Sequence, residues 1–412
     1  MNIGGWQTIS LEKILISRND KSKQVKSSDY LAIGIYPIVD QSSDFICGYC
    51  DDSRKVISSG LPYTIFGDHT RHTKFIDFPF IVGADGTQIL KPTSGIDHRF
   101  FFYLISQAAE KIGNYGYDRH FKHLKEFHCH YPTDEEEQTQ IAAILSTIDR
   151  AIEQTEAIIA KQQRIKAGLM QDLLTKGIDE DGNVRSEETH EFKDSESGRI
   201  PVEWRCQKVA TLAYVTKLAG FEFTNYFDYQ KGGEIIALRA LNIKNEKIDL
   251  TDIQTIPKNI SDKLPRSKIN KDDILITYIG AYIGDVLRIE ENEKYHLAPN
   301  IAKIVAGIKV IPPFLELALR SQYLQRQIQN LIVTTATPSL TMTQIRTLFV
   351  VFPKNVSEQN LIVQAVQPIS EAIGQNLSKL SKLQKQKTGL MQDLLTGKVR
   401  VTELLKDAEA SP

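Results

Sequence analysis

Cysteine is scarce in this chain of 412 residues, and long apolar runs are missing from it. The four cysteines do not make the dense disulfide framework that holds small secreted domains together. No apolar stretch approaches the ~20 residues that a membrane-spanning helix needs. The first residues also lack the basic and then apolar pattern of a secretion signal. We therefore expect a protein that folds in water and works in the cytoplasm.

A large charge excess of either sign is also missing, since the formal net charge is −1. The acidic residues are concentrated in one segment, because residues 132–192 hold 14 Asp and Glu against 6 Lys and Arg. Residues 1–131 hold 14 against 15, and residues 193–352 hold 17 against 21. Binding to phosphates depends on local contacts rather than on the total charge. The charge pattern thus permits DNA binding without requiring it.

Two stretches resemble catalytic or nucleotide-binding motifs, but each lacks an essential part of the motif. IPPF at residues 311–314 has the Pro-Pro-aromatic element of adenine methyltransferases, but Ile311 stands where that chemistry needs a hydrogen-bond acceptor. Gly389, Gly397 and Lys398 have the wrong spacing for a phosphate-binding loop. We assign no catalytic and no cofactor-binding residue to this chain, which disfavours a self-sufficient modification enzyme.

The motif CGYC, with Cys47 and Cys50, has the spacing of a zinc ligand pair, and the HCH at residues 128–130 could complete a site. The alternative is that these cysteines are small apolar residues at the end of a strand. Since no second CxxC is present, we favour the alternative and assign no metal site. Seven of the nine histidines fall within residues 1–131, where they could contact DNA or simply lie on a polar surface.

One octapeptide, GLMQDLLT, occurs twice, as residues 168–175 and as residues 389–396, so the copies are offset by 221 positions. With this offset the match continues backwards without a gap for more than forty residues. The matched pairs include Lys166 with Lys387, Gln138 with Gln359, Glu137 with Glu358, and Pro132 with Pro353. Self-similarity of this length indicates a duplicated structural unit.

Within each copy the apolar residues recur in steps of four and three, which is typical of a coiled-coil seam. In the first copy they are Ile141, Leu145, Ile148, Ile152, Ile159, Leu169 and Leu173, and in the second Ile362, Val366, Ile369, Ile373, Leu380, Leu383, Leu390 and Leu394. The sequence TDEE from Thr133 predicts a helix over about 134–175 that ends at Gly177. Pro368 predicts a kink or a late start in the second helix.

A globular stretch precedes each helix, and each opens near a tryptophan, Trp6 or Trp204. Both stretches contain short β-branched and aromatic runs, turn residues and helical pieces, which predict an α+β fold. The expected segments are a first globular domain at 1–131, a first helix at 132–176, a charged linker at 177–200, a second globular domain at 201–352, a second helix at 353–401 and a tail at 402–412.

A helix with one narrow apolar stripe needs a partner, and the other copy of the repeat is available within the chain. An antiparallel pair of this kind would relate the two globular domains by an approximate two-fold axis. Duplex DNA offers equivalent groove faces about one turn, ~34 Å, apart, so such a pair suits the reading of two separated half-sites. An ordinary helical hairpin, or a scaffold that joins protein partners, would show the same periodicity. Salt-dependent binding to a duplex with two separated specific segments discriminates between these possibilities.

The chain resembles the specificity subunit of type I restriction-modification enzymes. The likeness is carried by the alternation of globular domain and helix, by FPFIVGADGTQILKP (78–92), by KINKDDILITYIGAYIGDV (268–286) and by GLMQDLLTGKVRV (389–401). The resemblance implies two target recognition domains, at 1–131 and at about 201–352, that read the halves of an asymmetric bipartite DNA site. It implies that the two helices set the unread gap between the halves.

The same resemblance implies the partners. They are double-stranded DNA, two methylation subunits that bind S-adenosylmethionine, and restriction subunits, with ATP and magnesium also used by the partner subunits. The chain itself would be a non-catalytic reader.

Polar and aromatic side chains beside tight turns are the best candidates for contact with DNA, because loops on a rigid scaffold can reach base edges. In the first domain the candidates are His69, Thr70, Arg71, His72, Lys74, Tyr115, Tyr117, Arg119, His120 and Lys122. In the second domain they are Arg239, Asn242, Arg266, Lys268, Thr277, Tyr278, Tyr282, Thr335, Thr337 and Ser339.

Overall fold

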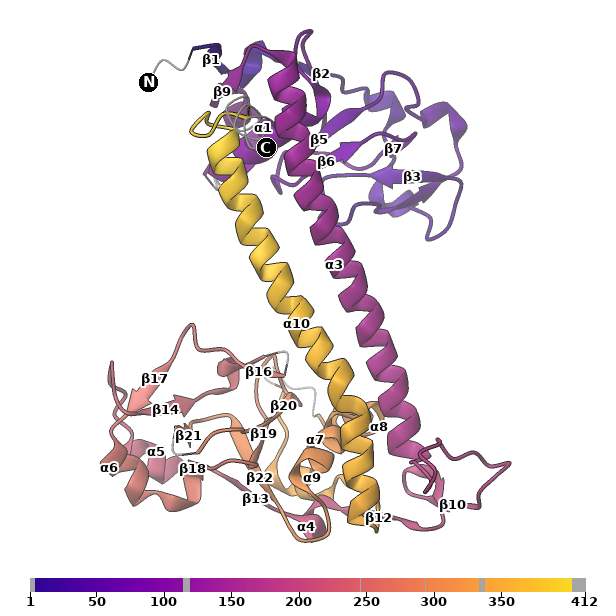
Figure 1. Ribbon diagram of the computed structural model, residues 1–412, viewed down its shortest axis with the longest axis vertical. Coiled ribbons are helices and arrows are strands. Elements are labelled where there is room, and N and C mark those ends of the chain that lie inside the picture. Colours follow the sequence, from indigo (N-terminus) through magenta and orange to yellow (C-terminus); the bar gives the residue numbers. More distant parts are fainter. Residues whose placement is uncertain (1–3, 114–118, 245, 293, 333–337, 402–412) are drawn as a thin grey trace, which may run out of the picture. The chain divides into compact units, whose positions relative to one another are not determined.

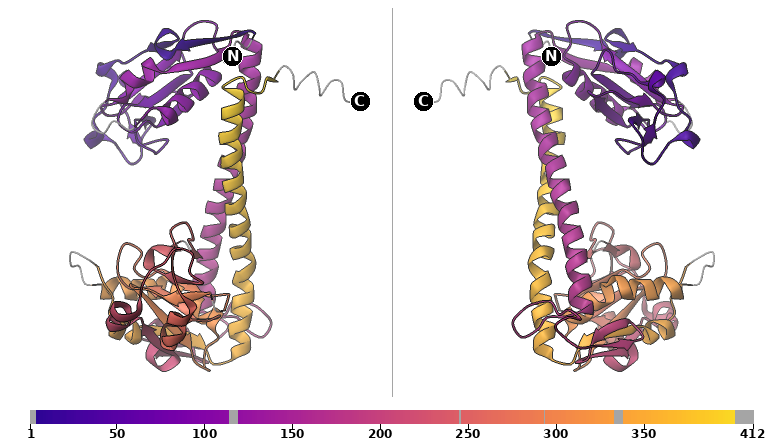
Figure 2. Two further views of the ribbon diagram at one scale, coloured as in Figure 1. Left: turned by 90° about the vertical axis from the view of Figure 1, so that its left-hand side faces the viewer. Right: turned by 90° about the vertical axis from the view of Figure 1, so that its right-hand side faces the viewer.

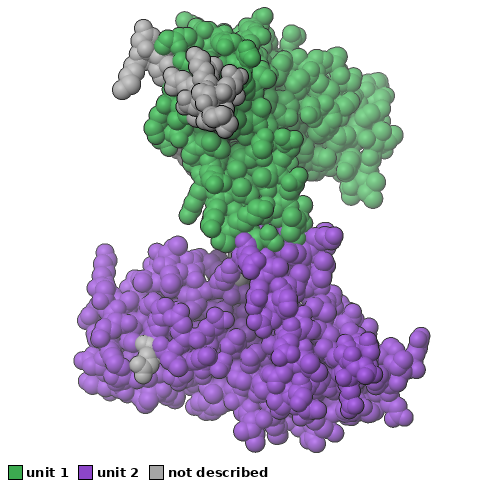
Figure 3. All heavy atoms as spheres, viewed as in Figure 1, with its two compact units in different colours: residues 1–158, 376–412 green, residues 159–375 purple. Residues whose placement is uncertain are grey.

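The computed structural model describes residues 4–113, 119–244, 246–292, 294–332 and 338–401. The chain forms two compact units (Figure 3), of which unit 1 contains residues 1–158 and 376–412 and unit 2 contains residues 159–375. Each unit is therefore built from the beginning of one repeated helix and the end of the other. Within the described ranges, no helix is both long enough and apolar enough to cross a membrane.

Two long helices dominate the fold (Figure 1), α3 at Glu135–Thr175 and α10 at Val356–Leu394. The first agrees with the predicted range to within one residue, and Gly177 follows its end in the left-handed conformation with φ 72°. The fold is mixed α/β, as expected from the two kinds of periodicity in the sequence.

Pro368 does not delay the second helix, so the predicted late start is wrong. Helix α10 runs without interruption from Val356 through Pro368. Proline removes one backbone hydrogen bond, which would otherwise join residue 368 to the carbonyl of Gln364. Both Gln364 and Pro368 are exposed, so water can satisfy the freed carbonyl, while Ile362 and Val366 on the other face are buried.

Unit 1 contains one four-stranded sheet, one three-stranded sheet and one strand pair within its described residues. The four-stranded sheet has the order β2-β8-β5-β6 and the three-stranded sheet the order β4-β3-β7. All pairs are antiparallel except β3 with β7. The strands are β1 Trp6–Ser10, β2 Leu15–Ser17, β3 Tyr36–Val39, β4 Gly48–Cys50, β5 Tyr63–Gly67, β6 Thr73–Ile76, β7 Ile81–Val82, β8 Thr87–Pro92 and β9 His128–Pro132, and the short helices are α1 His98–Lys111 and α2 His120–Glu126.

Unit 2 repeats this plan with insertions. Its sheets have the orders β13-β22-β19-β20 and β17-β14-β21-β18, and β14 pairs with β21 in parallel as β3 does with β7. The strands are β10 Phe192–Ser195, β11 Gly198–Pro201, β12 Trp204–Lys208, β13 Ala213–Lys217, β14 Ile235–Leu238, β15 Ile243–Lys244, β16 Lys247–Ile248, β17 Gln254–Ile256, β18 Lys268–Ile269, β19 Ile274–Thr277, β20 Val286–Arg288, β21 Tyr295–Leu297, β22 Ile301–Ala306 and β23 Phe349–Pro353. The helices are α4 Val209–Leu212, α5 Gly220–Tyr226, α6 Lys258–Lys263, α7 Pro312–Arg320, α8 Gln322–Leu331 and α9 Met342–Thr347.

The two tryptophans open equivalent strand pairs. Strand β1 pairs with β9 so that Trp6 faces Pro132, and β12 pairs with β23 so that Trp204 faces Pro353. Each proline comes a few residues before a long helix, so the strand pair closes a domain at the point where its helix begins. The globular stretches marked in the sequence by tryptophan and proline are thus closed by antiparallel pairing of their ends.

Inside each unit, a buried ion pair fastens the segment that follows one repeated helix to the beginning of the other. In unit 1, Arg400 donates to both oxygens of Glu137 at 2.6 and 2.7 Å, and the Glu137 side chain is 1% exposed. In unit 2, Arg185 pairs with Glu358, which also accepts from Trp204 Nε1 at 3.0 Å. Glu137 and Glu358 are matched positions of the repeat. We call these two pairs the Arg–Glu clasps.

The glutamines that follow these glutamates have matching roles as well. Gln138 Nε2 donates to the carbonyl of Pro132 at 2.9 Å, and Gln359 Nε2 donates to that of Pro353 at 3.0 Å. Each glutamine is fully buried and also accepts a backbone N–H from its own domain. The repeated Glu-Gln pair therefore joins each long helix to the globular domain before it.

The segment predicted as a linker, residues 177–200, is more than a connector. Arg185 lies in it, Ile178 and Ile200 are buried, and it contains the β10 strand and most of β11. Gly177 is required at its beginning, because a Cβ there would lie 2.4 to 2.5 Å from Glu358, Arg185 and Trp204. The low apolar content of this segment concealed its role in closing unit 2.

Both units pack the start of one long helix beside the end of the other (Figures 1 and 2). In unit 1, Ile141 and Leu145 of α3 share a core with Met391 and Leu394 of α10. In unit 2, residues of the first octapeptide share a core with Ile362 and Val366; they are Met170, Leu173 and Leu174. The predicted seam residues Leu173 and Leu394 are therefore buried at the helix ends, whereas Leu169 and Leu390 are half-buried.

Candidate functional site

Some of the predicted DNA-contact residues lie at or beside one sheet turn in each unit. In unit 1 the turn joins β5 to β6, and in unit 2 it joins β19 to β20. The two turns are equivalent, because β5-β6 and β19-β20 take the same places in sheets of the same order. We call them the β5–β6 turn (residues 68–72) and the β19–β20 turn (residues 278–285).

In unit 1, Asp68 joins the β5–β6 turn to the start of helix α2. Its side chain is 2% exposed, and its carboxylate accepts the backbone N–H of Phe121 at 2.7 Å. Its carbonyl accepts the N–H of His120 at 2.9 Å. Arg119 Nε lies 4.0 Å from the Asp68 carboxylate, with its side chain 71% exposed. The structure thus brings together two candidate groups that are about fifty residues apart in the sequence.

Arg71 gives this turn its shape. It has a positive φ of 62°, and its Nη1 donates to the carbonyl of Ile112 at 2.8 Å. The turn is thereby connected to the end of α1, just before residues 114–118. His69, Thr70 and His72 are left exposed beside it. The exposed candidates with a described position in unit 1 are therefore His69, Thr70, His72, Arg119 and Lys122.

Two candidates of unit 1 are buried. Lys74 is 5% exposed, and its ammonium group donates to the carbonyls of Asp40, at 2.8 Å, and Asp44. His120 is 1% exposed, with Nδ1 2.8 Å from the carbonyl of Asp68. Both side chains already bind the protein's own backbone. Alternation along strand β6 could have flagged Lys74, since it shares the buried face with Ile76.

In unit 2 the β19–β20 turn is held by its own backbone and by the segment before α9. Leu340 N donates to the carbonyl of Tyr278 at 2.9 Å, and Ile279 forms a bridge with Ser339. Thr277 Oγ1 donates to the carbonyl of Tyr282. Each unit therefore joins its sheet turn to a later segment of the same domain, at the start of α2 in unit 1 and just before α9 in unit 2. Ser339 is half-buried at this junction.

Tyr282 is the exposed aromatic residue of this turn, with 41% of its surface accessible. The Lys244 ammonium lies 5.9 Å from its ring centroid, and the Lys217 ammonium lies 5.1 Å from that of Tyr278. The sequence reading missed both lysines, because they come from β13 and β15, far from the turn in the chain. Lys244 also pairs with Asp249 at 2.9 Å, so it could reach a phosphate only by exchanging that partner.

Three candidates of unit 2 have structural roles instead. Asn242 and Thr277 are fully buried, and Tyr278 is 8% exposed. Asn242 Nδ2 donates to the carbonyls of Asp249 and Asp252 at 2.9 and 2.7 Å. These side chains shape the loops and cannot reach a ligand from their present positions.

Three charged candidates of unit 2 are engaged in ion pairs. Arg239 pairs with Asp252 at 3.1 Å, Arg266 pairs with Glu222 at 2.8 Å, and Lys268 pairs with Asp262. They could reach DNA only by exchanging these partners. The remaining candidates lie outside the described residues; they are Tyr115, Tyr117, Thr335 and Thr337.

The cysteine motif has local partners. The Cys47 thiol donates to the Asp40 carboxylate at 2.8 Å, and burial together with that carboxylate raises its pKa. No group of three or more His, Cys, Asp and Glu side chains in the described ranges is arranged to hold a metal ion.

Comparison with known proteins places this geometry in a family. Residues 4–162 and residues 201–384 each match the family described as type I restriction modification DNA specificity domain. The chain belongs to this family. The two matches cover most of the sequence, and each contains one of the turns described above, so the two sheet turns are features of a duplicated specificity domain.

Individual relatives agree with the family. The chain is 26% identical over 274 residues to the type I restriction enzyme MjaVIII specificity subunit of Methanocaldococcus jannaschii, a match that covers 65% of this chain and 61% of that protein. It is 32% identical over 143 residues to the type I restriction enzyme EcoBI specificity subunit of Escherichia coli, which covers 34% of this chain and 29% of the relative. The matches thus span less than two thirds of either relative.

A solved structure supports the fold. The S subunit of a type I restriction-modification system from M. genitalium has a TM-score of 0.61 with 16% identity, and 96% of each chain is covered. At this identity the likeness supports the arrangement of the elements and says nothing about individual binding residues.

Proposed function

We propose that this chain is the DNA-reading, non-catalytic specificity subunit of a type I restriction-modification complex. In this proposal unit 1 and unit 2 each read one half of an asymmetric, bipartite DNA target. The observation that carries the proposal is the duplication of one specificity domain within one chain, with a turn at the same place in each sheet and a long helix after each domain. Partner subunits then methylate or cut the DNA that this chain has selected.

The loops assigned to DNA are the β5–β6 turn with the start of α2, and the β19–β20 turn with the segment before α9. The first offers His69, His72 and Arg119 to a duplex, and the second offers Tyr282 with Lys217 and Lys244. Histidine and arginine can donate to phosphates and to base edges, and tyrosine can pack against sugars or bases. Because the two sets of side chains differ, the two half-sites should differ in sequence.

The helices α3 and α10 act in this proposal as an antiparallel coiled-coil spacer, related to itself by an approximate two-fold axis. The reciprocal burial of seam residues in each unit supports this arrangement. An α-helix rises 1.5 Å per residue, so helices of 41 and 39 residues are about 60 Å long and can separate two half-sites by more than one turn of DNA.

The partners in this proposal are two methylation subunits and the restriction subunits. S-adenosylmethionine, ATP and magnesium would be bound by those subunits and not by this chain. The complex would work in the cytoplasm, where its DNA is accessible. The repeated octapeptide GLMQDLLT would offer matching docking surfaces to the two methylation subunits.

Mapping of methylated bases tests the function. Methylation should be mapped in cells that express this chain with its methylation subunit, and in cells that express the methylation subunit alone. We expect methylation at one bipartite sequence with an unread gap in the first case and none of it in the second. The purified complex should bind a duplex of that sequence with an affinity that falls steeply as salt is raised. Methylation at an uninterrupted sequence, or independent of this chain, would overturn the proposal.

A further inference from the structure

The lysine that precedes each octapeptide has different partners in the two copies of the repeat. Lys166 and Lys387 are matched positions. In unit 1, Lys387 of α10 pairs with Asp149 of α3 at 2.7 Å. The residue that matches Asp149 in the second copy is Ser370, which carries no charge. Lys166 therefore has no equivalent carboxylate on the opposite helix.

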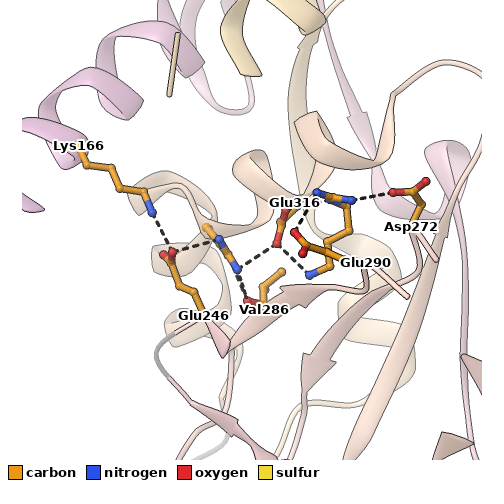
Figure 4. A network of polar contacts seen from close by, with 8 residues as sticks. Lys166, Glu246, Asp272, Val286, Glu290 and Glu316 are labelled. Atoms are coloured by element: carbon orange, nitrogen blue, oxygen red, sulfur yellow. Dashed lines mark hydrogen bonds and ion pairs between the residues drawn. The ribbon is translucent and has the colours of Figure 1, made fainter. Parts of the chain in front are cut away.

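Lys166 instead binds a carboxylate from the recognition domain of unit 2. Its ammonium group lies 2.8 Å from Glu246 Oε2 (Figure 4). Glu246 lies between strands β15 and β16, and its φ of 63° turns the chain back sharply at this point. The Lys166 side chain is 12% exposed, so its charge is held away from bulk water and needs this partner.

Glu246 is shared with a cation of the domain core. Arg320 Nη1 lies 3.2 Å from the same oxygen of Glu246, and Arg320 Nη2 lies 3.0 Å from Glu316. Arg320 also donates from Nε and Nη2 to the carbonyl of Val286 on strand β20 at 3.1 and 3.0 Å. One carboxylate thus joins the spacer helix α3, the hairpin β15–β16 and helix α7.

The network continues to β20, the strand that follows the β19–β20 turn. Glu316 accepts the backbone N–H of Arg288 at 2.8 Å, and Arg288 Nη1 lies 2.7 Å from Asp272. The side chains of Glu316, Arg320 and Arg288 are 12%, 14% and 19% exposed. Coulomb attraction from Arg320 and the hydrogen bond from Lys166 lower the pKa of Glu246 despite the opposing effect of burial. Half-buried charges in a connected network hold their geometry better than an isolated surface pair.

Unit 1 has a bridge of the same kind, made from different residues. Asp149, which binds Lys387, also accepts a hydrogen bond from Tyr103 of helix α1 at 2.7 Å. Helix α1 packs on the β2-β8-β5-β6 sheet in unit 1, and α7 packs on the corresponding sheet in unit 2. In both units the repeated lysine therefore pairs with a carboxylate that has a second partner. That partner lies on the helix that packs against the four-stranded sheet, α1 in unit 1 and α7 in unit 2.

We propose that the Lys166–Glu246–Arg320 bridge is a positioning lock that holds the second recognition domain on helix α3 and so sets how strictly the chain discriminates between DNA gap lengths. This inference rests on the proposed function. When the gap changes by one base pair, each half-site moves along and around the duplex, so a domain must turn on its helix to follow. The lock opposes that rotation because turning separates Glu246 from Lys166.

The test compares Lys166→Met with wild type, with Lys166→Arg as the conservative variant and with Lys176→Met as the matched control. Lys176 directly follows helix α3 and pairs with Asp172 of that helix at 2.8 Å, so its replacement removes a lysine ion pair outside the Lys166–Glu246–Arg320 bridge. Each complex is titrated with duplexes that carry the mapped target with its native gap, or with one base pair added or removed. The measured quantity is the ratio of affinities for native and altered gaps.

We expect Lys166→Met to lower this ratio about tenfold, since coupling within one ion-pair network is commonly worth a factor of that size. Lys166→Arg should restore the ratio, and Lys176→Met should leave it unchanged. Amide hydrogen exchange of residues 243, 244 and 246–248 gives a measurement without DNA, and it should be faster in Lys166→Met than in wild type. An unchanged affinity ratio, or unchanged exchange at the hairpin, would overturn the lock.

Failure of the proposed function gives a different result. In that case the wild-type complex itself would show no preference for a bipartite duplex with one gap length. The exchange measurement would still report whether Lys166 holds the hairpin, so the two failures are distinguishable.

Discussion

Single residues at matched positions of the repeat perform matched tasks, and the Arg–Glu clasps are the clearest case. Glu137 and Glu358 lie at the beginning of the long helices, where an acidic side chain also favours the helix dipole. Each is buried and neutralised by an arginine that comes after the opposite octapeptide. A buried carboxylate without such a partner is strongly unfavourable. The stability of each unit therefore depends on an arginine that is distant from the glutamate in the sequence.

Replacement of Arg400 by Ala should therefore destabilise unit 1, although Arg400 lies near the end of the sequence. The unpaired Glu137 carboxylate should cost about 3 kcal/mol of the free energy of unfolding. Amide hydrogen exchange can measure this by unit, with residues 128–132 reporting on unit 1 and residues 349–353 on unit 2. Arg185→Ala is the reciprocal control and should act on unit 2. Equal effects of either variant on both strand pairs would contradict the assignment of one clasp to each unit.

A second residue-scale effect depends on pH. Burial opposes ionisation of Glu222, but hydrogen bonds from Ala219 N and Arg266 outweigh it and lower its pKa. A lowered folded-state pKa adds stability above the ordinary glutamate value, and that stability is lost as the pH falls through the folded-state pKa. Glu222→Gln should thus destabilise unit 2 by about 1 to 2 kcal/mol near pH 7, and this destabilisation should shrink steadily as the pH falls below the ordinary glutamate pKa.

Urea denaturation followed by Trp204 fluorescence in a Trp6→Phe background measures this difference, because the chain has 2 tryptophans and Trp204 lies in unit 2. A destabilisation by Glu222→Gln that persists unchanged at low pH would show that the charge of Glu222 is not its cause.

At the scale of elements, the two long helices differ in regularity but not in continuity. The 4-3 spacing of apolar residues keeps α10 helical through Pro368, because the buried stripe of Ile362, Val366 and Ile373 needs one continuous helix. Local propensity at one residue is overridden by burial along the whole face. The proline lies on the exposed side, where the loss of a hydrogen bond is cheapest.

Pro368→Ala should accordingly stabilise α10 by restoring the missing hydrogen bond. We expect amide exchange of residues 369–373 to slow about fivefold or more, which corresponds to about 1 kcal/mol. Thr147→Ala is the matched control, since Thr147 is the exposed residue at the same position of α3. It should change exchange in its own helix by less than about twofold. Faster exchange in the Pro368→Ala variant would mean that the helix needs a local distortion at this point.

At the scale of the whole molecule, the proposed function makes the two units independent readers. The β5–β6 turn follows Phe66 of one hydrophobic core, and the β19–β20 turn begins with Tyr278 of another. Specificity for the two half-sites should be separable by mutation for the same reason.

His72→Ala should weaken recognition of one half-site, and Tyr282→Ala that of the other. Loss of one good base contact costs about 1 to 3 kcal/mol, or roughly tenfold to a hundredfold in affinity for the correct base. Binding to duplexes with single substitutions across the mapped target shows which positions become tolerant in each variant. Asn242→Ala, in which a buried loop residue is lost, serves as a comparison, because it should destabilise unit 2 rather than relax one base position. Tolerance in the same half-site for both surface variants would contradict the assignment of one reader to each unit.

The sequence by itself determined the duplication and the two long helices. These features follow from periodicity and from exact repetition, which are local properties of the chain. It also identified the two sheet turns, because glycine and polar residues between β-branched runs mark turns wherever they occur. It could not separate His120, Asn242 and Thr277 from exposed neighbours of the same type, since burial depends on what packs against a loop.

Only the tertiary structure decided which residues complete each unit. Arg400 and Arg185 are ordinary basic residues in the sequence, and Lys217 and Lys244 stand far from Tyr278 and Tyr282. Their roles arise because folding brings distant segments of the chain side by side. Side chains separated by many residues in the sequence then lie a few ångströms apart. Coulomb attraction and the cost of burying an unpaired charge act on distance in space, and a pattern along the chain carries no record of that distance.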